Sequence, residues 1–163
     1  MDRRLLILAL GMFALGTDSF VVAGILPMVS RSMNVTVAVA GQMVTLYAIS
    51  YALLSPVVAA AAAHWPRKTL LLSALAVFVV GNVMTAMAPT LTMLFASRLV
   101  AGLGADMFSP TATAAGASLV PPEQRGRALA VIVAGLSSAT ALGSPIGTVL
   151  GGDVSTHLIE IIA

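Results

Sequence analysis

Long apolar runs alternate along the chain with short polar connections. Each run has roughly the 20 residues that a helix needs to cross a hydrocarbon core about 30 Å thick. Lipid cannot satisfy backbone polar groups, so such runs must be helical. The connections contain prolines and charged residues that end helices. The pattern predicts an all-α integral membrane protein with five spanning helices, at residues 5–29, 39–63, 69–88, 91–116 and 128–150.

The composition supports this prediction and excludes several soluble classes. Of the 163 residues, 59% are hydrophobic and 9% are charged, and the mean hydropathy is +1.04. A typical soluble domain has about 25% charged residues, so this chain cannot give a soluble core a polar surface. A net charge of +2 gives no sign of a nucleic-acid partner. Cysteine is absent and the two histidines are isolated, so we expect no metal and no cofactor.

The basic residues favour one side of the predicted bundle. Cytoplasmic connections of membrane proteins are enriched in Lys and Arg. If the N-terminus is cytoplasmic, six basic residues of the connections lie inside and only Arg31 lies outside. The six are Arg3, Arg4, Arg67, Lys68, Arg125 and Arg127. We therefore expect a multi-pass protein with a cytoplasmic N-terminus and the lipid bilayer as its first partner.

Three charged residues inside the predicted spans are the leading functional candidates. A charge at membrane depth costs at least about 2.5–3.5 kcal/mol, so it usually faces a bundle interior or a cavity. Helical rise places Asp18 and Arg98 at similar depth, about 10 Å below the outer face, so the two can face one cavity and pair. The carboxylate either exchanges a proton or binds a cationic substrate, or the pair is static and holds two helices together. Asp106 is expected near the cytoplasmic end, within reach of water.

The predicted fifth helix has small residues at four-residue spacing, which places them along one face. They are Gly135, Ala139, Gly143, Gly147 and Gly151. Such a face lets another backbone approach closely, and Pro145 should bend the helix. The face is either a packing seam or a seam whose bend opens one side of a cavity. On the fourth helix, Gly102 and Gly104 also predict close packing.

Polar side chains on two other predicted helices are candidate cavity liners. Each could equally form an interhelical hydrogen bond worth about 0.6 kcal/mol. The second helix has Thr45, Tyr47 and Ser50, and the fourth has Ser109, Thr111 and Thr113.

Four segments carry motifs of a known family. Residues 16–27 hold an acidic residue followed by an apolar stretch that ends in Leu-Pro, and residues 94–105 hold Arg98 followed by a glycine-rich turn. Residues 122–128 read Pro-Glu-Gln-Arg-Gly-Arg-Ala, and residues 143–148 read Gly-Ser-Pro-Ile-Gly-Thr. Together they resemble the N-terminal part of a major facilitator superfamily transporter, in the twelve-helix branch of proton-coupled drug and sugar efflux. The resemblance implies that Arg98 acts in proton coupling and that the glycine–proline segment is an antiporter motif.

A further family motif, Gly-x-Leu-x-Asp-Arg-x-Gly-Arg-Lys, is degraded in this chain. Only Arg67 and Lys68 fit it, as part of a gating loop, and the gating salt bridge attributed to its Asp cannot form. The departures are Ala59, Ala63, His64 and Pro66.

The resemblance implies a bacterial cytoplasmic-membrane antiporter that exports drugs, including antibiotics, or small metabolites in exchange for protons. It covers about residues 5–152 and accounts for five helices of a six-helix half. Residues 153–163 form an aberrant extracytoplasmic tail, too short to span. We expect a truncated piece, inactive without the missing C-terminal half. The alternative is a small accessory membrane protein that packs on a partner through its glycine seam. A membrane enzyme is disfavoured, because no nucleophile–base pair is assembled.

Overall fold

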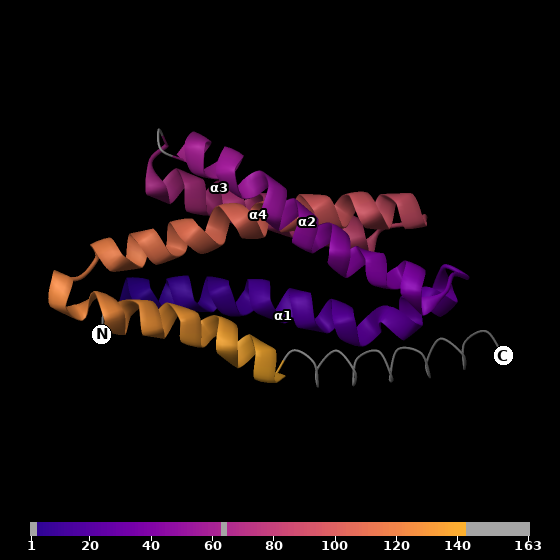
Figure 1. Ribbon diagram of the computed structural model, residues 1–163, viewed down its shortest axis with the longest axis horizontal. Helices are drawn as coiled ribbons and strands as arrows, with labels where there is room; N and C mark the ends of the chain where they lie inside the picture. Colours follow the sequence, from indigo (N-terminus) through magenta and orange to yellow (C-terminus); the bar gives the residue numbers. More distant parts are fainter. Residues whose placement is uncertain (1–2, 63–64, 143–163) are drawn as a thin grey trace.

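The computed structural model describes residues 3–62 and 65–142, and for residues 54–62 it describes the backbone only. In this part of the chain the elements are helical (Figure 1). The α-helices are α1 (Arg3–Ser32), α2 (Val37–Ala62), α3 (Arg67–Ala86) and α4 (Leu91–Ser118), followed by the 3₁₀ turn η1 (Pro122–Gln124). Residues 125–142 are helical as well.

Short connections with turn-forming residues separate the helices. Thr36 accepts a hydrogen bond from the backbone N–H of Val39 and so begins α2, and Thr90 does the same for Met93 at the start of α4. Asn34, between α1 and α2, has a φ of 52°, a left-handed conformation that asparagine tolerates better than most residues. These local signals mark the starts of α2 and α4 and the turn that follows α1.

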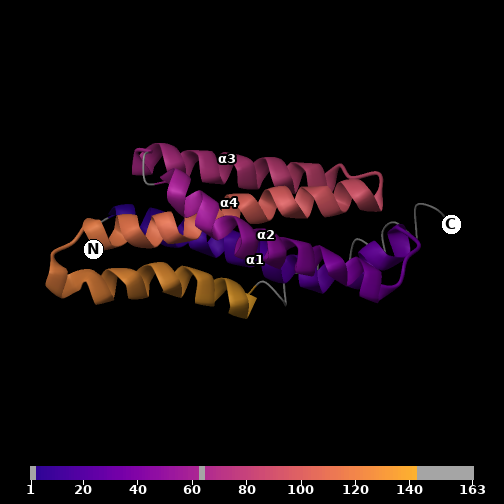
Figure 2. The ribbon, with the colours of Figure 1, turned by 45° about the horizontal axis from the view of Figure 1, so that its top comes forward.

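Helix α4 lies at the centre of the bundle. It packs most extensively on α3, then on α2, and also contacts α1. The N-terminal half of α1 and the helix at 125–142 lie side by side on the other flank (Figures 1 and 2). The core includes Leu8 and Met12 of α1, Phe78 of α3, Phe108 of α4 and Ile132. Helices α1, α2 and α3 therefore pack around α4 and do not form a flat layer.

The outer surface of the bundle is apolar, as expected for helices that face lipid. Three of the described helices, α1, α3 and α4, are long and apolar enough to cross a membrane, and α2 is apolar over Val37–Leu53. Large hydrophobic side chains point outward, including Leu10 at 68% exposure and the exposed Val79, Val80 and Val83. An apolar surface of this extent is typical of a membrane protein and not of a soluble monomer.

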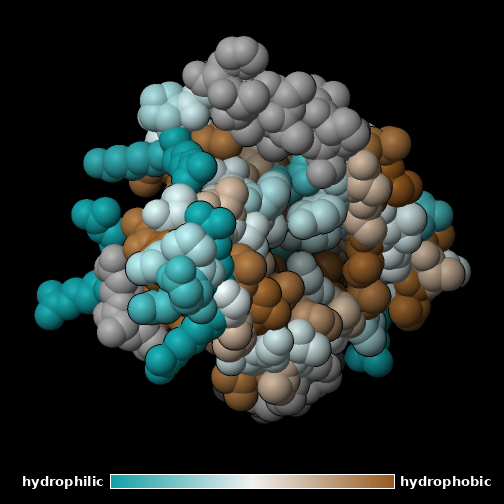
Figure 3. Space-filling view, turned by 60° about the vertical axis from the view of Figure 1, so that its left-hand side comes forward, coloured by the Kyte–Doolittle hydropathy of each residue, from teal (hydrophilic) through white to brown (hydrophobic). Residues whose placement is uncertain are grey.

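The helix bounds differ from the expected spans mainly at their ends. Helix α1 begins two residues earlier and ends three residues later than expected, and Asp18 stays near its middle. The basic residues at the starts of α1 and α3 lie at one end of the bundle. Figure 3 brings that end forward and shows hydrophilic side chains projecting there, with hydrophobic ones between them. The full count of five spans and the cytoplasmic N-terminus stay predictions, and the tail at 153–163 lies outside the described residues.

Candidate functional site

Asp18 of α1 and Arg98 of α4 form an ion pair inside the bundle. The Nη1 atom of Arg98 lies 3.1 Å from Oδ2 of Asp18. The arginine side chain is 1% exposed and the aspartate side chain 12% exposed. The pairing that the similar depth of these residues predicted is therefore present, and it joins two helices that are 80 residues apart in sequence at this point.

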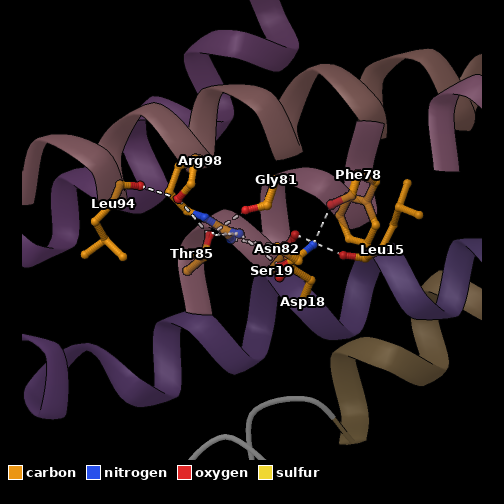
Figure 4. Close-up of polar contacts among 10 residues, drawn as sticks. Leu15, Asp18, Ser19, Phe78, Gly81, Asn82, Thr85, Leu94 and Arg98 are labelled. Carbon is orange, nitrogen blue, oxygen red and sulfur yellow. Dashed lines mark hydrogen bonds and ion pairs between the residues drawn. The ribbon is translucent and has the colours of Figure 1, made fainter. Parts of the chain in front are cut away.

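Helix α3 supplies the other partners of the guanidinium group. Nη2 of Arg98 donates to Oδ1 of Asn82 at 3.1 Å and to Oγ1 of Thr85 at 3.0 Å. Figure 4 shows these side chains converging on the guanidinium from α1, α3 and α4. Arg98 is thus held by one charged and two neutral acceptors, which offsets much of the cost of burying its charge.

Backbone groups fix the orientation of the two neutral acceptors. Asn82 donates its amide N–H to the carbonyl of Phe78 at 3.1 Å, which turns its Oδ1 toward Arg98. The Thr85 hydroxyl lies 2.9 Å from the carbonyl of Gly81 and 2.7 Å from the hydroxyl of Ser97. Because both acceptors are held by their own helix, the position of Arg98 does not depend on Asp18 alone.

A small cavity lies beside Arg98 on the side of α2. The guanidinium carbon is 5.9 Å from the centre of the Tyr47 ring, within range of a cation–π contact. The cavity has a volume of about 20 Å³ and is lined by Ser19, Tyr47 and Arg98 together with three apolar residues. This volume is above the roughly 10–15 Å³ that one water needs. Nε of Arg98 is buried and has no hydrogen-bond partner among the described residues.

Glycines let α4 come close enough to its neighbours to enclose the site. A Cβ atom on Gly81 would lie 2.5 Å from the backbone nitrogen of Ala101, and one on Gly104 would lie 2.5 Å from that of Phe78. A Cβ on Gly102 would lie 2.9 Å from the carbonyl oxygen of Tyr47. The close packing predicted for Gly102 and Gly104 is therefore confirmed, and Arg98 is buried because α4 fits between α2 and α3.

The polar residues predicted as candidate cavity liners lie in different surroundings. Tyr47 lies against Arg98, but Ser50 is buried and donates to the carbonyl of Leu99 at 2.8 Å, so it links α2 to α4 instead of lining a cavity. Thr45 is exposed. Thr111 and Thr113 donate to carbonyls of their own helix. Of the two interpretations left open, the interhelical hydrogen bond is the one that Ser50 adopts.

Asp106 and the gating-loop residues lie away from this site. The expectation that Asp106 reaches cytoplasmic water is wrong, because α4 is central and the side chain is 1% exposed within the bundle. Arg67 and Lys68 are exposed in the first turn of α3, and Arg67 donates from Nη1 to the hydroxyl of Ser118 at the end of α4. Ala59, Ala63 and His64 lie outside the residues whose side chains are described.

The glycine face of the last helix packs on α1. A Cβ on Gly135 would collide with the backbone carbonyl of Ala9, and a Cβ on Gly16 would lie 2.7 Å from Cβ of Ala139. Gly135 and Ala139 therefore lie in a packing seam, and the chain itself supplies the partner helix, α1. The rest of the seam lies outside the described residues: Gly143, Pro145, Gly147 and Gly151.

Sequence reasoning missed three residues of the network, namely Asn82, Thr85 and Ser97. A signal was present, since Asn82 and Thr85 are polar residues three positions apart in an otherwise apolar helix, which places them on one face. Ser97, buried next to Arg98, carries no such signal, because a lone serine is common in membrane helices.

Comparisons with known proteins agree with these features. The chain is 34% identical over 147 residues to the uncharacterized MFS-type transporter YtbD of Bacillus subtilis, which covers 90% of this chain and 37% of that protein. It is 37% identical over 151 residues to the chloramphenicol resistance protein of Streptomyces lividans, covering 93% and 38%. It is 33% identical over 154 residues to the inner membrane transport protein YdhP of Escherichia coli K12, and this alignment covers 94% of the present chain and 40% of YdhP. The chain thus spans about two fifths of the length of these relatives.

The family model described as Major Facilitator Superfamily matches residues 8–163, which includes both members of the ion pair. The apolar helices that surround a buried arginine fit a multi-pass membrane protein of this kind. The chain belongs to the Major Facilitator Superfamily of membrane transporters.

Proposed function

We propose that this chain is the N-terminal portion of a proton-coupled antiporter that exports drugs or small metabolites across the bacterial cytoplasmic membrane. The observation that carries the proposal is the Asp18–Arg98 ion pair at the centre of the bundle. Ionisable residues at membrane depth are rare and mark proton relays and substrate pathways in transporters. The similarity to a chloramphenicol resistance protein supports a drug-like substrate and export.

In this mechanism Asp18 takes up and releases the proton, and Arg98 is its counter-charge. When Asp18 is ionised, the pair ties α1 to α4. When Asp18 is protonated, the attraction is lost and α1 is freer to move. Asn82 and Thr85 keep the guanidinium in place in both states, because their hydrogen bonds do not involve Asp18. A proton can thereby bias two arrangements of α1, which is what coupling requires.

Other elements take supporting roles in the proposal. Arg67 and Lys68, in the first turn of α3, take part in gating this end of the bundle. The antiporter role of the glycine–proline motif at 143–148 is part of the proposal and rests on the sequence alone. Tyr47 borders the small cavity beside Arg98, and Thr45 would face substrate only after α2 moves, since it is exposed.

Export requires more than the described helices. Transporters of this type bind substrate at the interface of two repeats and alternate access by rocking them. We infer that these 163 residues do not export by themselves and that further transporter helices complete the cavity. The missing C-terminal half, or a partner membrane protein, is the partner implied.

The test measures accumulation of chloramphenicol in a susceptible bacterium. One strain expresses the chain together with any transporter sequence found next to its gene, and a second expresses the 163 residues alone. We expect proton-gradient-dependent efflux only in the first strain, and its loss in the Asp18→Asn and Arg98→Ala variants. Efflux that persists in Asp18→Asn would contradict the coupling role. Efflux by the 163 residues alone would contradict the need for further helices.

A further inference from the structure

A groove lies at the end of the bundle where α3 begins, away from the Asp18–Arg98 pair. It has a volume of about 630 Å³ and lies where α1 and α3 begin and α4 ends. Its basic lining residues are Arg4, Arg67 and Lys68, and its apolar wall includes Leu71, Leu72 and Leu75 of α3. The groove therefore combines a basic rim with an apolar wall.

The electrostatics of this end favour an anion. None of the described residues that line the groove is acidic. Helices α1 and α3 both begin here, and neither has an acidic residue in its first turn. A helix N-terminus carries a partial positive charge, which the basic residues of the first turn reinforce instead of compensating. The hydrogen bond from Arg67 to Ser118 holds one of the guanidinium groups across the groove, between α3 and α4.

The depth of the groove fits a lipid and not a spanning helix. Its wall on α3 runs from Arg67 to Leu75, which is about 12 Å along the helix axis. This is slightly less than one leaflet of a hydrocarbon core about 30 Å thick. A second membrane helix would pack along the whole length of α3 and would bring apolar side chains to a basic rim.

We propose that this groove binds one anionic phospholipid of the adjacent leaflet. The phosphate lies between Arg4, Arg67 and Lys68, and an acyl chain lies along Leu71, Leu72 and Leu75. Basic pockets between membrane helices commonly hold such headgroups. The bound lipid joins the starts of α1 and α3 where both present positive charge. The inference does not depend on the direction or substrate of transport.

The single tryptophan of the chain provides a local probe. Trp65 is 52% exposed and precedes Arg67 by two residues. The full chain is reconstituted in vesicles of phosphatidylcholine that contain a small fraction of brominated lipid, which quenches tryptophan on contact. Phosphatidylglycerol and phosphatidylcholine, each brominated near the headgroup end of the acyl chains, are compared at equal fractions. We expect a relative affinity for phosphatidylglycerol about fivefold or more higher, the effect of roughly one well-placed cation at a membrane surface.

Two matched triple variants separate the groove from general surface charge. The first is R4Q/R67Q/K68Q, which removes the rim. The second is R3Q/R125Q/R127Q, which removes three exposed charges that are absent from the groove lining. We expect the preference for phosphatidylglycerol to be lost in the first variant and kept in the second. Equal loss in both would overturn the proposal in favour of non-specific surface attraction.

A third variant keeps the charges and fills the groove. Ala115 lines it and is half-buried, so Ala115→Phe places a ring where the acyl chain would lie. We expect the preference to fall several-fold while the helical content, measured by circular dichroism, stays at the level of the unaltered chain. An unchanged preference in this variant would overturn the proposed binding mode. Equal quenching by both lipids in the unaltered chain would overturn the proposal as a whole. The groove would then hold a different occupant, such as a second copy of the chain or another helix.

Discussion

Arg98 donates from Nη1 to Oδ2 of Asp18 at 3.1 Å, across an interval of 80 residues. The same guanidinium donates from Nη2 to α3, so one side chain connects three helices. Burying an arginine with a single partner would cost several kcal/mol of desolvation free energy, roughly, whereas three acceptors offset much of that cost. The contact is therefore both a structural link and a place where one proton can change the charge balance of the bundle.

Removing the charge of Asp18 should destabilise the bundle without abolishing membrane insertion. In Asp18→Asn the amide oxygen can still accept from Arg98, but the buried guanidinium loses its counter-charge. We expect the free energy of unfolding to fall by about 2–4 kcal/mol, toward the lower end of the range for broken buried ion pairs. Detergent-based unfolding followed by circular dichroism measures this change. Unaltered stability would mean that the pair contributes nothing to the fold.

A double-mutant cycle should reveal direct coupling between the two charges. Asp18→Asn and Arg98→Gln each leave one group without its partner, while the double variant leaves no buried charge at this site. We expect the double variant to be less destabilised than the sum of the single changes, by about 1 kcal/mol or more. Additive effects would show that the contact carries no interaction energy.

The support from α3 should be measurable separately from the ion pair. Thr85→Val removes a hydroxyl that accepts from Arg98, and we expect the free energy of unfolding to fall by about 1–2 kcal/mol. Thr113→Val is the matched control, because the Thr113 hydroxyl bonds only to carbonyls of its own helix in the described structure. If the free energy of unfolding falls equally in both variants, the hydrogen bond between Thr85 and Arg98 contributes no additional stability.

Glycines at helix contacts should be intolerant of even one methyl group. In Gly104→Ala the new Cβ would lie 2.5 Å from the backbone nitrogen of Phe78, and in Gly135→Ala it would meet the carbonyl of Ala9. We expect each change to cost about 1–3 kcal/mol, because backbone atoms must move apart.

The control for this prediction is alanine at Gly41 and Gly126, where nothing lies within 4 Å of the new Cβ. There we expect no loss, and up to about 1 kcal/mol gained from better helix propensity. Thermal unfolding in detergent distinguishes the two groups. Similar effects at all four positions would contradict the packing described.

The existence of the membrane helices follows from local sequence. Apolar runs of spanning length can only be helical in lipid, and residues such as Thr36, Thr90 and Pro66 mark where helices begin. Helix ends were less predictable, because polar residues at an interface are compatible with either state. Thus α1 continues to Ser32, beyond the expected end at residue 29.

The ion pair was also predictable, since two opposite charges at similar depth in apolar helices have few other ways to avoid lipid. The neutral residues of the network were not predictable, because uncharged polar side chains cost little free energy in a membrane helix and are common there. They are Asn82 and Thr85, which accept from Arg98, and Ser97, which bonds to Thr85. Their role depends on which face of α3 meets α4, and Gly81 and Gly104 determine this through close approach.

The sequence by itself determined that the chain crosses a membrane as helices, which residues are charged within them, and which family it resembles. These properties depend on composition, length and short motifs, each local to a stretch of chain. Only the tertiary structure decided that Asp106 is enclosed, that Ser50 links α2 to α4, and that Gly135 meets Ala9. Such outcomes depend on the rotation of each helix about its axis. That rotation is set by packing between segments far apart in sequence, because the apolar residues surround each helix and mark no preferred face.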